Sequence, residues 1–219
     1  MRGPIDAAAR ALLGAVLLSE VDGIRTAGVV VETEAYIGVH DPASHAAARI
    51  GRTRRNDSMF GPAGTAYVYR SHGIHDCVNV VGGPVGQPLA VLIRALHPLE
   101  GLDRMAARRG RAHDLCSGPG RLCQALHIRG SLDGHDLGSP PLRLLQGWTV
   151  PASCVGTSGR VGVSRAADWP LRFFVRGESS VSRGRVRPPR RGTSFRRALL
   201  ESVAVAGSAV DPSPETLER

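Results

Sequence analysis

The sequence predicts an α+β fold, a single mixed domain in which short helices flank a mainly antiparallel β-sheet. The chain has 219 residues, the length of one compact domain or of one domain and a tail. Several short segments alternate between apolar and polar residues or are rich in β-branched residues, as strands are. Helical periodicity is confined to three short stretches set among them, which is the pattern of a mixed α+β domain.

The first predicted element is a helix that starts near Pro4 and carries apolar residues at positions 8, 12, 13 and 16. The apolar run 11–18 after Arg10 also has the length of a short signal-peptide core. However, Asp6 precedes the run, and Ser19-Glu20-Val21-Asp22 follows it where small cleavage-site residues are expected. We therefore predict an amphipathic helix. No run approaches the ~18–20 apolar residues of a membrane span, so we expect no membrane partner.

Residues 25–37 contain the run Val29-Val30-Val31 and then alternate, which predicts one or two strands. Residues 38–64 are rich in Gly, Pro, Asp, Ser and Arg and show little periodicity. An irregular stretch of this length within a domain is typical of a functional loop. Residues 66–81 alternate again, and the glycines of residues 82–86 predict a turn.

Residues 89–96 form an apolar strand interrupted by Arg94. Residues 98–109 carry Leu99, Leu102 and Met105 at helical spacing, and residues 121–128 predict a second short helix before a turn at 130–134. The remaining strands are predicted at residues 142–145, 161–163 and 171–175.

All 28 basic residues are arginine, and the formal net charge is +9. The lack of lysine excludes a lysine Schiff base, a P-loop lysine and a lysine general base. Four cysteines (Cys77, Cys116, Cys123 and Cys154) form no CxxC pair. We therefore expect free, mostly buried thiols in a reducing compartment.

The composition changes near residue 180, and residues 183–197 hold seven arginines and no acid. We expect residues 1–182 to form the domain and residues 183–219 to be a flexible arginine-rich extension, with a short amphipathic helix over 194–205. A polyanion is the commonest partner of such a tail, and a solvated extension without function is the alternative.

Glu34 is the first candidate for chemistry. Glu32, Glu34 and Tyr36 share one face of a strand that enters the long loop, where a carboxylate beside an aromatic ring suits a general base. A solvent-facing strand edge is the alternative. Tyr67 and Tyr69 are expected to face the same way. They could stack on nucleobases or simply pack across strands.

His72, His75 and Cys77 are spaced like metal ligands, with Asp76 beside them and His45 or Cys116 available to complete a set. No established zinc signature matches, but a metal-dependent hydrolase remains an alternative at this point. Taken with the basic charge and the few clustered aromatic residues, Glu34 points to an enzyme that acts on a nucleic-acid base.

The segment Val31-Glu32-Thr33-Glu34-Ala35-Tyr36-Ile37-Gly38 resembles the catalytic segment of the alkyladenine (3-methyladenine) DNA glycosylase family. Matching segments follow in order, and together they cover about residues 7–182. They include residues 41–45, 53–56, 59–60, 64–69, 77–80, 92–96, 98–101, 115–119, 122–126, 160–163 and 171–177.

The resemblance implies a curved antiparallel sheet and a positively charged face for double-stranded DNA. It implies a monofunctional glycosylase that flips damaged purines, alkylated or deaminated, out of the duplex. Such an enzyme hydrolyses the N-glycosidic bond in base excision repair and leaves an abasic site. By matching position, Glu34 corresponds to the base that activates water, and Arg94 and the carbonyl of Val161 to groups that hold that water.

The same matching assigns Tyr36, His45 and Tyr69 to the pocket for the flipped base. It places Asn79 against the purine edge, where it rejects the amino group of guanine. His72 stands where the family has a tyrosine wedge that fills the gap left by the flipped base, with Ile74 and His75 beside it. An imidazole fills less of that gap.

We expect no cofactor and no metal, a monomer without an obligate protein partner, and a cytoplasmic location, on the nucleoid if the source is bacterial. A catalytically idle nucleic-acid binder on the same fold is the remaining alternative. The joint presence of Glu34, Tyr36, Arg94 and Asn79 argues against it, because a pure binder has no use for a water-activating pair.

Overall fold

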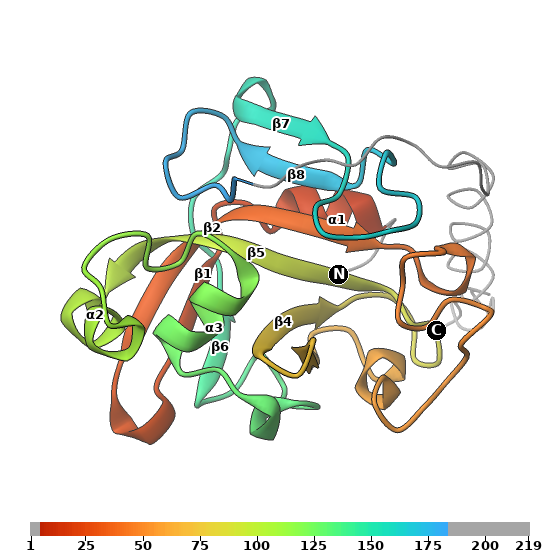
Figure 1. The fold of residues 1–219 in the computed structure, drawn as a ribbon, viewed down its shortest axis with the longest axis horizontal. Helices are drawn as coiled ribbons and strands as arrows, with labels where there is room; N and C mark the ends of the chain where they lie inside the picture. Colours follow the sequence, from red (N-terminus) through yellow and green to blue (C-terminus); the bar gives the residue numbers. More distant parts are fainter. Residues whose placement is uncertain (1–4, 184–219) are drawn as a thin grey trace, which may run out of the picture.

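The computed structural model describes residues 5–183, which form a curled antiparallel sheet with three helices (Figure 1). The helices are α1 (Ile5–Ala11), α2 (Leu102–Arg109) and α3 (Pro119–Leu126). The strands are β1 (Val16–Ser19), β2 (Thr26–Tyr36), β3 (Ala66–Ser71), β4 (His75–Val81), β5 (Ala90–Glu100), β6 (Leu142–Leu145), β7 (Val155–Ser158) and β8 (Arg172–Val175). The α+β fold predicted from the sequence is confirmed.

The long strand β2 lies at the centre of the sheet. Along one edge it pairs with β5, and along the other edge it pairs first with β1 and then with β8. The strand order is β3-β4-β5-β2-β1-β6, and β7 extends the sheet beyond β8. Both edges of β2 are therefore paired, and most side chains in its second half are buried, including the carboxylates of Glu32 and Glu34.

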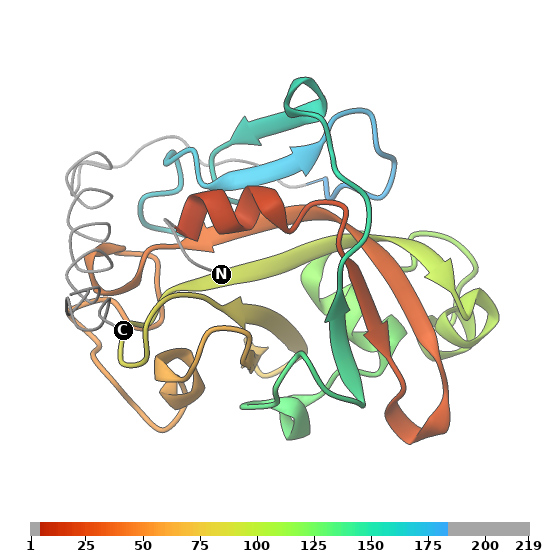
Figure 2. The same ribbon diagram turned by 180° about the vertical axis from the view of Figure 1, so that it is seen from behind.

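The helices cover the two faces of the sheet. In Figure 1, α3 lies in front of β5 and beside β4, with α2 next to α3, whereas α1 lies behind β2; in Figure 2, α1 is in front. From α1, Ile5 and Ala9 are buried, and the Ala9 carbonyl accepts a hydrogen bond of 2.8 Å from the Thr33 hydroxyl. From α3, the buried side chains are Leu122, Cys123, Ala125 and Leu126.

The N-terminal prediction is wrong in part. The helix ends at Ala11, and residues 16–19 form β1, a strand that the sequence analysis missed. The chain reverses at Gly14, which has a left-handed φ of 87°. An apolar run can serve a strand as well as a helix, and pairing with β2 and β6 decided the outcome here.

Three further boundaries differ from the prediction. Residues 98–100 continue β5, and α2 begins only after the left-handed Gly101. Residues 66–81 are two strands separated by a turn at His72 and Gly73, which both have positive φ (50° and 72°). Residues 161–163 form no strand, and the strand of that region is β7.

The other predicted elements are confirmed. The strands at 142–145 and 171–175 and the helix at 121–128 are present, with boundaries shifted by at most two residues. The long segment between β2 and β3 is irregular except for two 3-10 turns, at Gly38–His40 and Asp57–Phe60. The predicted arginine-rich extension, with its helix at 194–205, lies outside the described residues.

Gly14 provides a test of how the chain closes behind β1. A Cβ built at Gly14 would lie 1.9 Å from the backbone oxygen of Trp148, whereas a Cβ at Gly51, also left-handed, would meet no atom within 4 Å. We expect Gly14→Ala to destabilise the fold well beyond the ~1 kcal/mol of left-handed strain that Gly51→Ala introduces. Urea denaturation measures both variants, and equal losses would contradict the close approach of the two backbones.

Candidate active site

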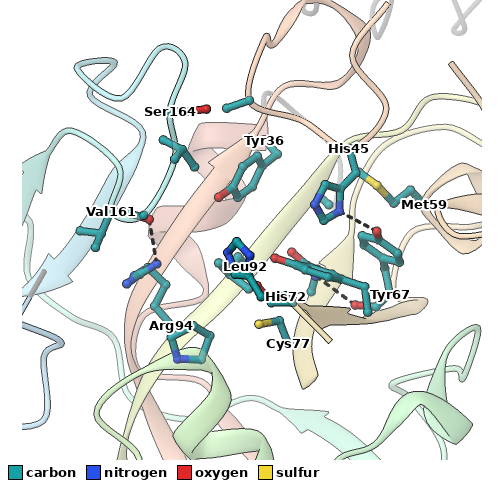
Figure 3. Close-up of a pocket in the computed structure, with 18 of the residues that line it drawn as sticks. Tyr36, His45, Met59, Tyr67, His72, Cys77, Leu92, Arg94, Val161 and Ser164 are labelled. Carbon is teal, nitrogen blue, oxygen red and sulfur yellow. Dashed lines mark hydrogen bonds between the residues drawn. The ribbon is translucent and has the colours of Figure 1, made fainter. Parts of the chain in front are cut away.

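A cavity of about 400 Å³ opens between the end of β2, the loop after it, the β3–β4 hairpin, β5 and the segment 161–164 (Figure 3). Its walls include Tyr36, His45, Tyr69, Asn79 and Arg94. These side chains come from β2, the loop after it, β3, β4 and β5, and Figure 3 shows Tyr36, His45 and Arg94 around the cavity. The sequence assigned all five to one site, and the fold places them in one cavity.

The aromatic wall is built on β3 and on the loop that carries His45. Tyr67 and Tyr69 project to the same side of β3, as expected, with ring centroids 5.4 Å apart and planes at 27°. The His45 ring stands edge-on to Tyr69, 4.3 Å away, and its Nδ1 lies 2.8 Å from the Tyr67 hydroxyl. Flat rings with a fixed spacing suit a planar ligand.

Glu34, on β2, is fully buried. The backbone N–H of Val161 donates to Oε1 at 2.7 Å, the Tyr36 hydroxyl donates to Oε2 at 3.0 Å, and Arg94 Nη1 lies 3.4 Å from Oε1. Glu34 itself is not among the lining residues, but these three partners are. The alternative of a solvent-facing strand edge is therefore wrong.

Arg94 and Asn79 border the cavity from β5 and β4. Arg94, which is 6% exposed, also donates from Nη1 to the Val161 carbonyl at 3.4 Å. Asn79 donates from its side-chain amide to the Tyr67 carbonyl at 3.0 Å, a bond that fixes the orientation of the amide. One polar group therefore stands on the aromatic side of the cavity, and a charged cluster stands opposite.

The environment keeps the hydroxyl of Tyr36 protonated. Burial, and next the negative charge of Glu34, raise the pKa of Tyr36 well above its ordinary value. Burial, and then the nearby Arg55, lower the pKa of His45, so this imidazole is neutral at neutral pH. Burial raises the pKa of Cys77, which also lines the cavity, to about 11. At neutral pH these three groups carry no charge, so the charge beside the cavity comes from Glu34 and the arginines.

A buried ion pair lies beneath Tyr36, and the sequence analysis missed it. Arg160 and Asp41 are both fully buried; Arg160 donates to both carboxylate oxygens of Asp41 and to the carbonyls of Ala35 and Ala166. The guanidinium carbon lies 4.9 Å from the centre of the Tyr36 ring. The two partners are 119 residues apart, so no local pattern could have linked them.

The donors proposed for a metal site do not converge. Within residues 5–183, no group of three or more His, Cys, Asp and Glu side chains could hold a metal ion together. Asp76 instead pairs with Arg70 at 3.2 Å, and the ring of His75 packs over Gly120 at the start of α3.

The three residues assigned to a DNA wedge lie at the β3–β4 turn. His72, Ile74 and His75 are all exposed, Ile74 by 70%. Of the three, only His72 also lines the cavity. They therefore form a protruding edge at the mouth of the cavity.

Comparison with known proteins identifies the family of the chain. Residues 1–179 match the model of the methylpurine-DNA glycosylase (MPG) family. The chain belongs to this family. A relative from Granulibacter bethesdensis is 54% identical over 175 residues, which are 78% of this chain and 79% of the relative. Relatives from Agrobacterium fabrum and Methanoculleus marisnigri are each 49% identical, over 80% of this chain and 86% and 92% of their own lengths.

All three relatives carry the name 3-methyladenine DNA glycosylase. The family predicted from the sequence is confirmed. As a family member the chain is a DNA glycosylase, a DNA-repair hydrolase that cleaves N-glycosidic bonds and has DNA as its substrate. None of the helices in residues 5–183 has the length and apolar character needed to cross a membrane.

The ion pair beneath Tyr36 gives a stability prediction. We expect Asp41→Asn to cost about 3–5 kcal/mol of unfolding free energy, because it leaves the buried Arg160 guanidinium without its counter-charge. Asp57→Asn is the matched control: it removes a carboxylate that pairs with Arg52 on the surface, and it should leave the denaturation midpoint unchanged. Chemical denaturation compares the two, and an Asp41→Asn midpoint equal to the control's would contradict the structural role of the pair.

Proposed function

We propose that the enzyme removes damaged purines, alkylated purines of the 3-methyladenine type first among them, from double-stranded DNA by flipping the damaged nucleotide into the cavity. One observation carries the proposal. A fully buried carboxylate, Glu34, is held by Arg94, the N–H of Val161 and the hydroxyl of Tyr36 immediately behind an aromatic cavity. A base that lies between the rings brings its glycosidic bond to the carboxylate side.

In this proposal, the purine lies among Tyr36, His45 and Tyr69. The neutral imidazole of His45 and the two phenol rings offer stacking and edge contacts that fit any flat base. Selection against normal guanine falls to Asn79, whose amide is fixed by the Tyr67 carbonyl. An exocyclic amino group at the purine edge would then clash with the Asn79 side chain, because the bond to Tyr67 prevents the amide from rotating.

Glu34 acts as the general base in the hydrolytic step. It takes a proton from a water molecule that Arg94 and the carbonyl of Val161 orient, and the water attacks the anomeric carbon as the purine departs. The negative charge that remains near the sugar stabilises its oxocarbenium character, as carboxylates do in glycoside hydrolysis. The N–H of Val161 keeps the carboxylate in the required position.

The chemistry of the cavity favours alkylated purines over neutral lesions. A cationic base such as 3-methyladenine leaves without further protonation, whereas a neutral base such as hypoxanthine or ethenoadenine needs a ring nitrogen protonated before it departs. In the described part of the chain, the cavity wall includes no Asp or Glu, and burial raises the pKa of its tyrosines. Because the chain contains no lysine to form a Schiff base, the product is an abasic site and the strand stays intact.

Contact with the duplex falls to the β3–β4 turn. His72, Ile74 and His75 protrude beside the cavity mouth and enter the gap that the flipped nucleotide leaves. His72 and Gly73 both hold left-handed backbones in the tight turn that the bond from the Ile74 N–H to the Ser71 carbonyl closes. We further propose that residues 1–182 act as one monomeric unit in a reducing, cytoplasmic compartment, in line with the free cysteines of the described chain.

Replacement of Glu34 by Gln tests the function. We expect base release from a duplex with 3-methyladenine or 7-methylguanine to fall at least ~100-fold, because an amide cannot take the proton from water. Binding to the same duplex should stay within about threefold, since Gln keeps the shape of Glu. Single-turnover release in the presence of EDTA and a binding titration measure the two effects. Duplexes with hypoxanthine and ethenoadenine, run alongside, test the preference for alkylated purines.

Glu100→Gln is the control, because this carboxylate pairs with Arg25 on the surface, away from the cavity. Release by Glu34→Gln at the wild-type rate would refute the assignment of Glu34. Tight binding by the wild type without release from any damaged duplex would instead support an idle binder.

The arginine-rich extension is proposed to contact DNA phosphates outside the described domain. Replacement of Arg185, Arg187, Arg190 and Arg191 by Gln in the full chain should weaken duplex binding and flatten its salt dependence. The slope of log K against log salt should fall by about 0.9 for each lost phosphate contact. The release step under saturating enzyme should not change. An unaltered slope would show that the extension makes no contact with DNA.

A further inference from the structure

A second buried carboxylate lies behind the proposed site. Glu32 is two residues before Glu34 on β2 and is likewise fully buried. Four donors bind its two oxygens: Arg94 Nε at 2.9 Å, Arg172 Nε at 2.6 Å, the Ser182 backbone N–H at 2.6 Å and the Ser182 hydroxyl at 2.8 Å. A carboxylate with so many short bonds has a single orientation.

The Arg94 guanidinium connects this cluster to Glu34. Its Nε donates to Glu32, and its Nη2 donates to the Ser182 hydroxyl at 3.2 Å. Its third nitrogen, Nη1, lies 3.4 Å from both Glu34 Oε1 and the Val161 carbonyl. The bonds to Glu32 and Ser182 fix the plane of the guanidinium, and that plane sets the position of Nη1 beside Glu34.

Ser182 is itself held in place by the segment around it. Its carbonyl accepts a bond of 3.1 Å from Arg172 Nη2. Glu178, four residues earlier, lies 3.2 Å from the Nδ1 of His97 on β5 and accepts the N–H of Ser180 at 3.0 Å. The segment therefore folds back against β5 and β8.

The cluster balances charge as well as geometry. Two carboxylates, Glu32 and Glu34, face two guanidinium groups, Arg94 and Arg172. Without the charge of Glu32, Arg94 would pair with Glu34 alone, and a carboxylate beside more net positive charge loses basicity.

We propose that Glu32 and Ser182 are positioning residues of the glycosylase reaction. Glu32 sets the basicity of Glu34 through the charge balance, and Ser182 holds Arg94 in the plane that serves the site. The inference rests on the function proposed above, since it takes Glu34 as the base and Arg94 as its partner. Glu32 and Ser182 act through Arg94, and neither is among the residues that line the cavity.

The pH profile of base release distinguishes this role from a purely structural one. A duplex with 7-methylguanine is used, because its base keeps a positive charge throughout the acidic range. For Glu32→Gln we expect single-turnover release to fall about tenfold or more, with the acidic limb of the profile shifted to lower pH. The other groups that act on Glu34 stay in place: Tyr36 on its own strand, Tyr69 on β3, and Arg160 in the loop before Val161.

Ser182 is tested by a set of full-chain variants. Ser182→Ala removes the hydroxyl that lies between Glu32 and Arg94 but keeps the backbone N–H, so we expect release to fall roughly tenfold with duplex binding unchanged. Ser182→Thr keeps a hydroxyl and should restore most of the rate. Ser179→Ala is the matched control, because this exposed serine on the same segment bonds only to its neighbour Glu178 among the described residues. It should match the wild type.

Glu34→Gln, run in parallel, separates this inference from the proposed function. If Glu34→Gln abolishes release but Ser182→Ala retains the wild-type rate, the inference is overturned and the function stands. A Glu32→Gln profile lowered equally at every pH would overturn the role of Glu32 in setting basicity. If Glu32→Gln does not fold, as its thermal transition would show, Ser182→Ala and Ser182→Thr decide the proposal. Release by Glu34→Gln at the wild-type rate would remove the basis of both.

Discussion

The structure depends on the burial of two carboxylates in the central strand. An unpaired carboxylate in a protein interior costs several kcal/mol. Strand β2 buries two carboxylates, Glu32 and Glu34, which are two residues apart along the strand. Arg94 from β5 and Arg172 from β8 supply the counter-charges from the strands on either side. The pairing of β2 with β5 and β8 therefore places an arginine on each neighbouring strand beside the buried carboxylates.

This arrangement gives the site its electrostatic character before any substrate binds. The carboxylate of Glu34 is held by donors that belong to the backbone and to another strand. His45 is neutral and Tyr36 protonated, so neither adds a charge of its own to the cavity. In the function proposed above, the aromatic rings would recognise a flat base, and the preorganised carboxylate would stabilise the positive charge that develops at the sugar.

The sequence predicts those features of the site that depend on residues close together in the chain. Alternation along residues 25–37 placed Glu34 and Tyr36 on one strand, and the spacing of Tyr67 and Tyr69 predicted their common face. The apolar run at 11–18 was wrongly predicted to continue the first helix, because either a helix or a strand can bury such a run. Only the pairing of β1 with β2 selects the strand. Contacts such as Arg160 with Asp41 join distant segments, and nothing in either neighbourhood specifies the partner.

The choice of arginine at position 94 follows from the number of partners it serves. Three nitrogens of one rigid plane reach Glu32, Ser182 and the pair formed by Glu34 and the Val161 carbonyl. A lysine ammonium is a single flexible nitrogen and could not hold these directions at once. In a chain whose basic residues are all arginine, the central site uses the property that distinguishes arginine from lysine, which is a charge with fixed geometry. The orientation of that charge is fixed by the bonds of Arg94 to Glu32 and Ser182, which join the segment after β8 to the buried carboxylates of β2.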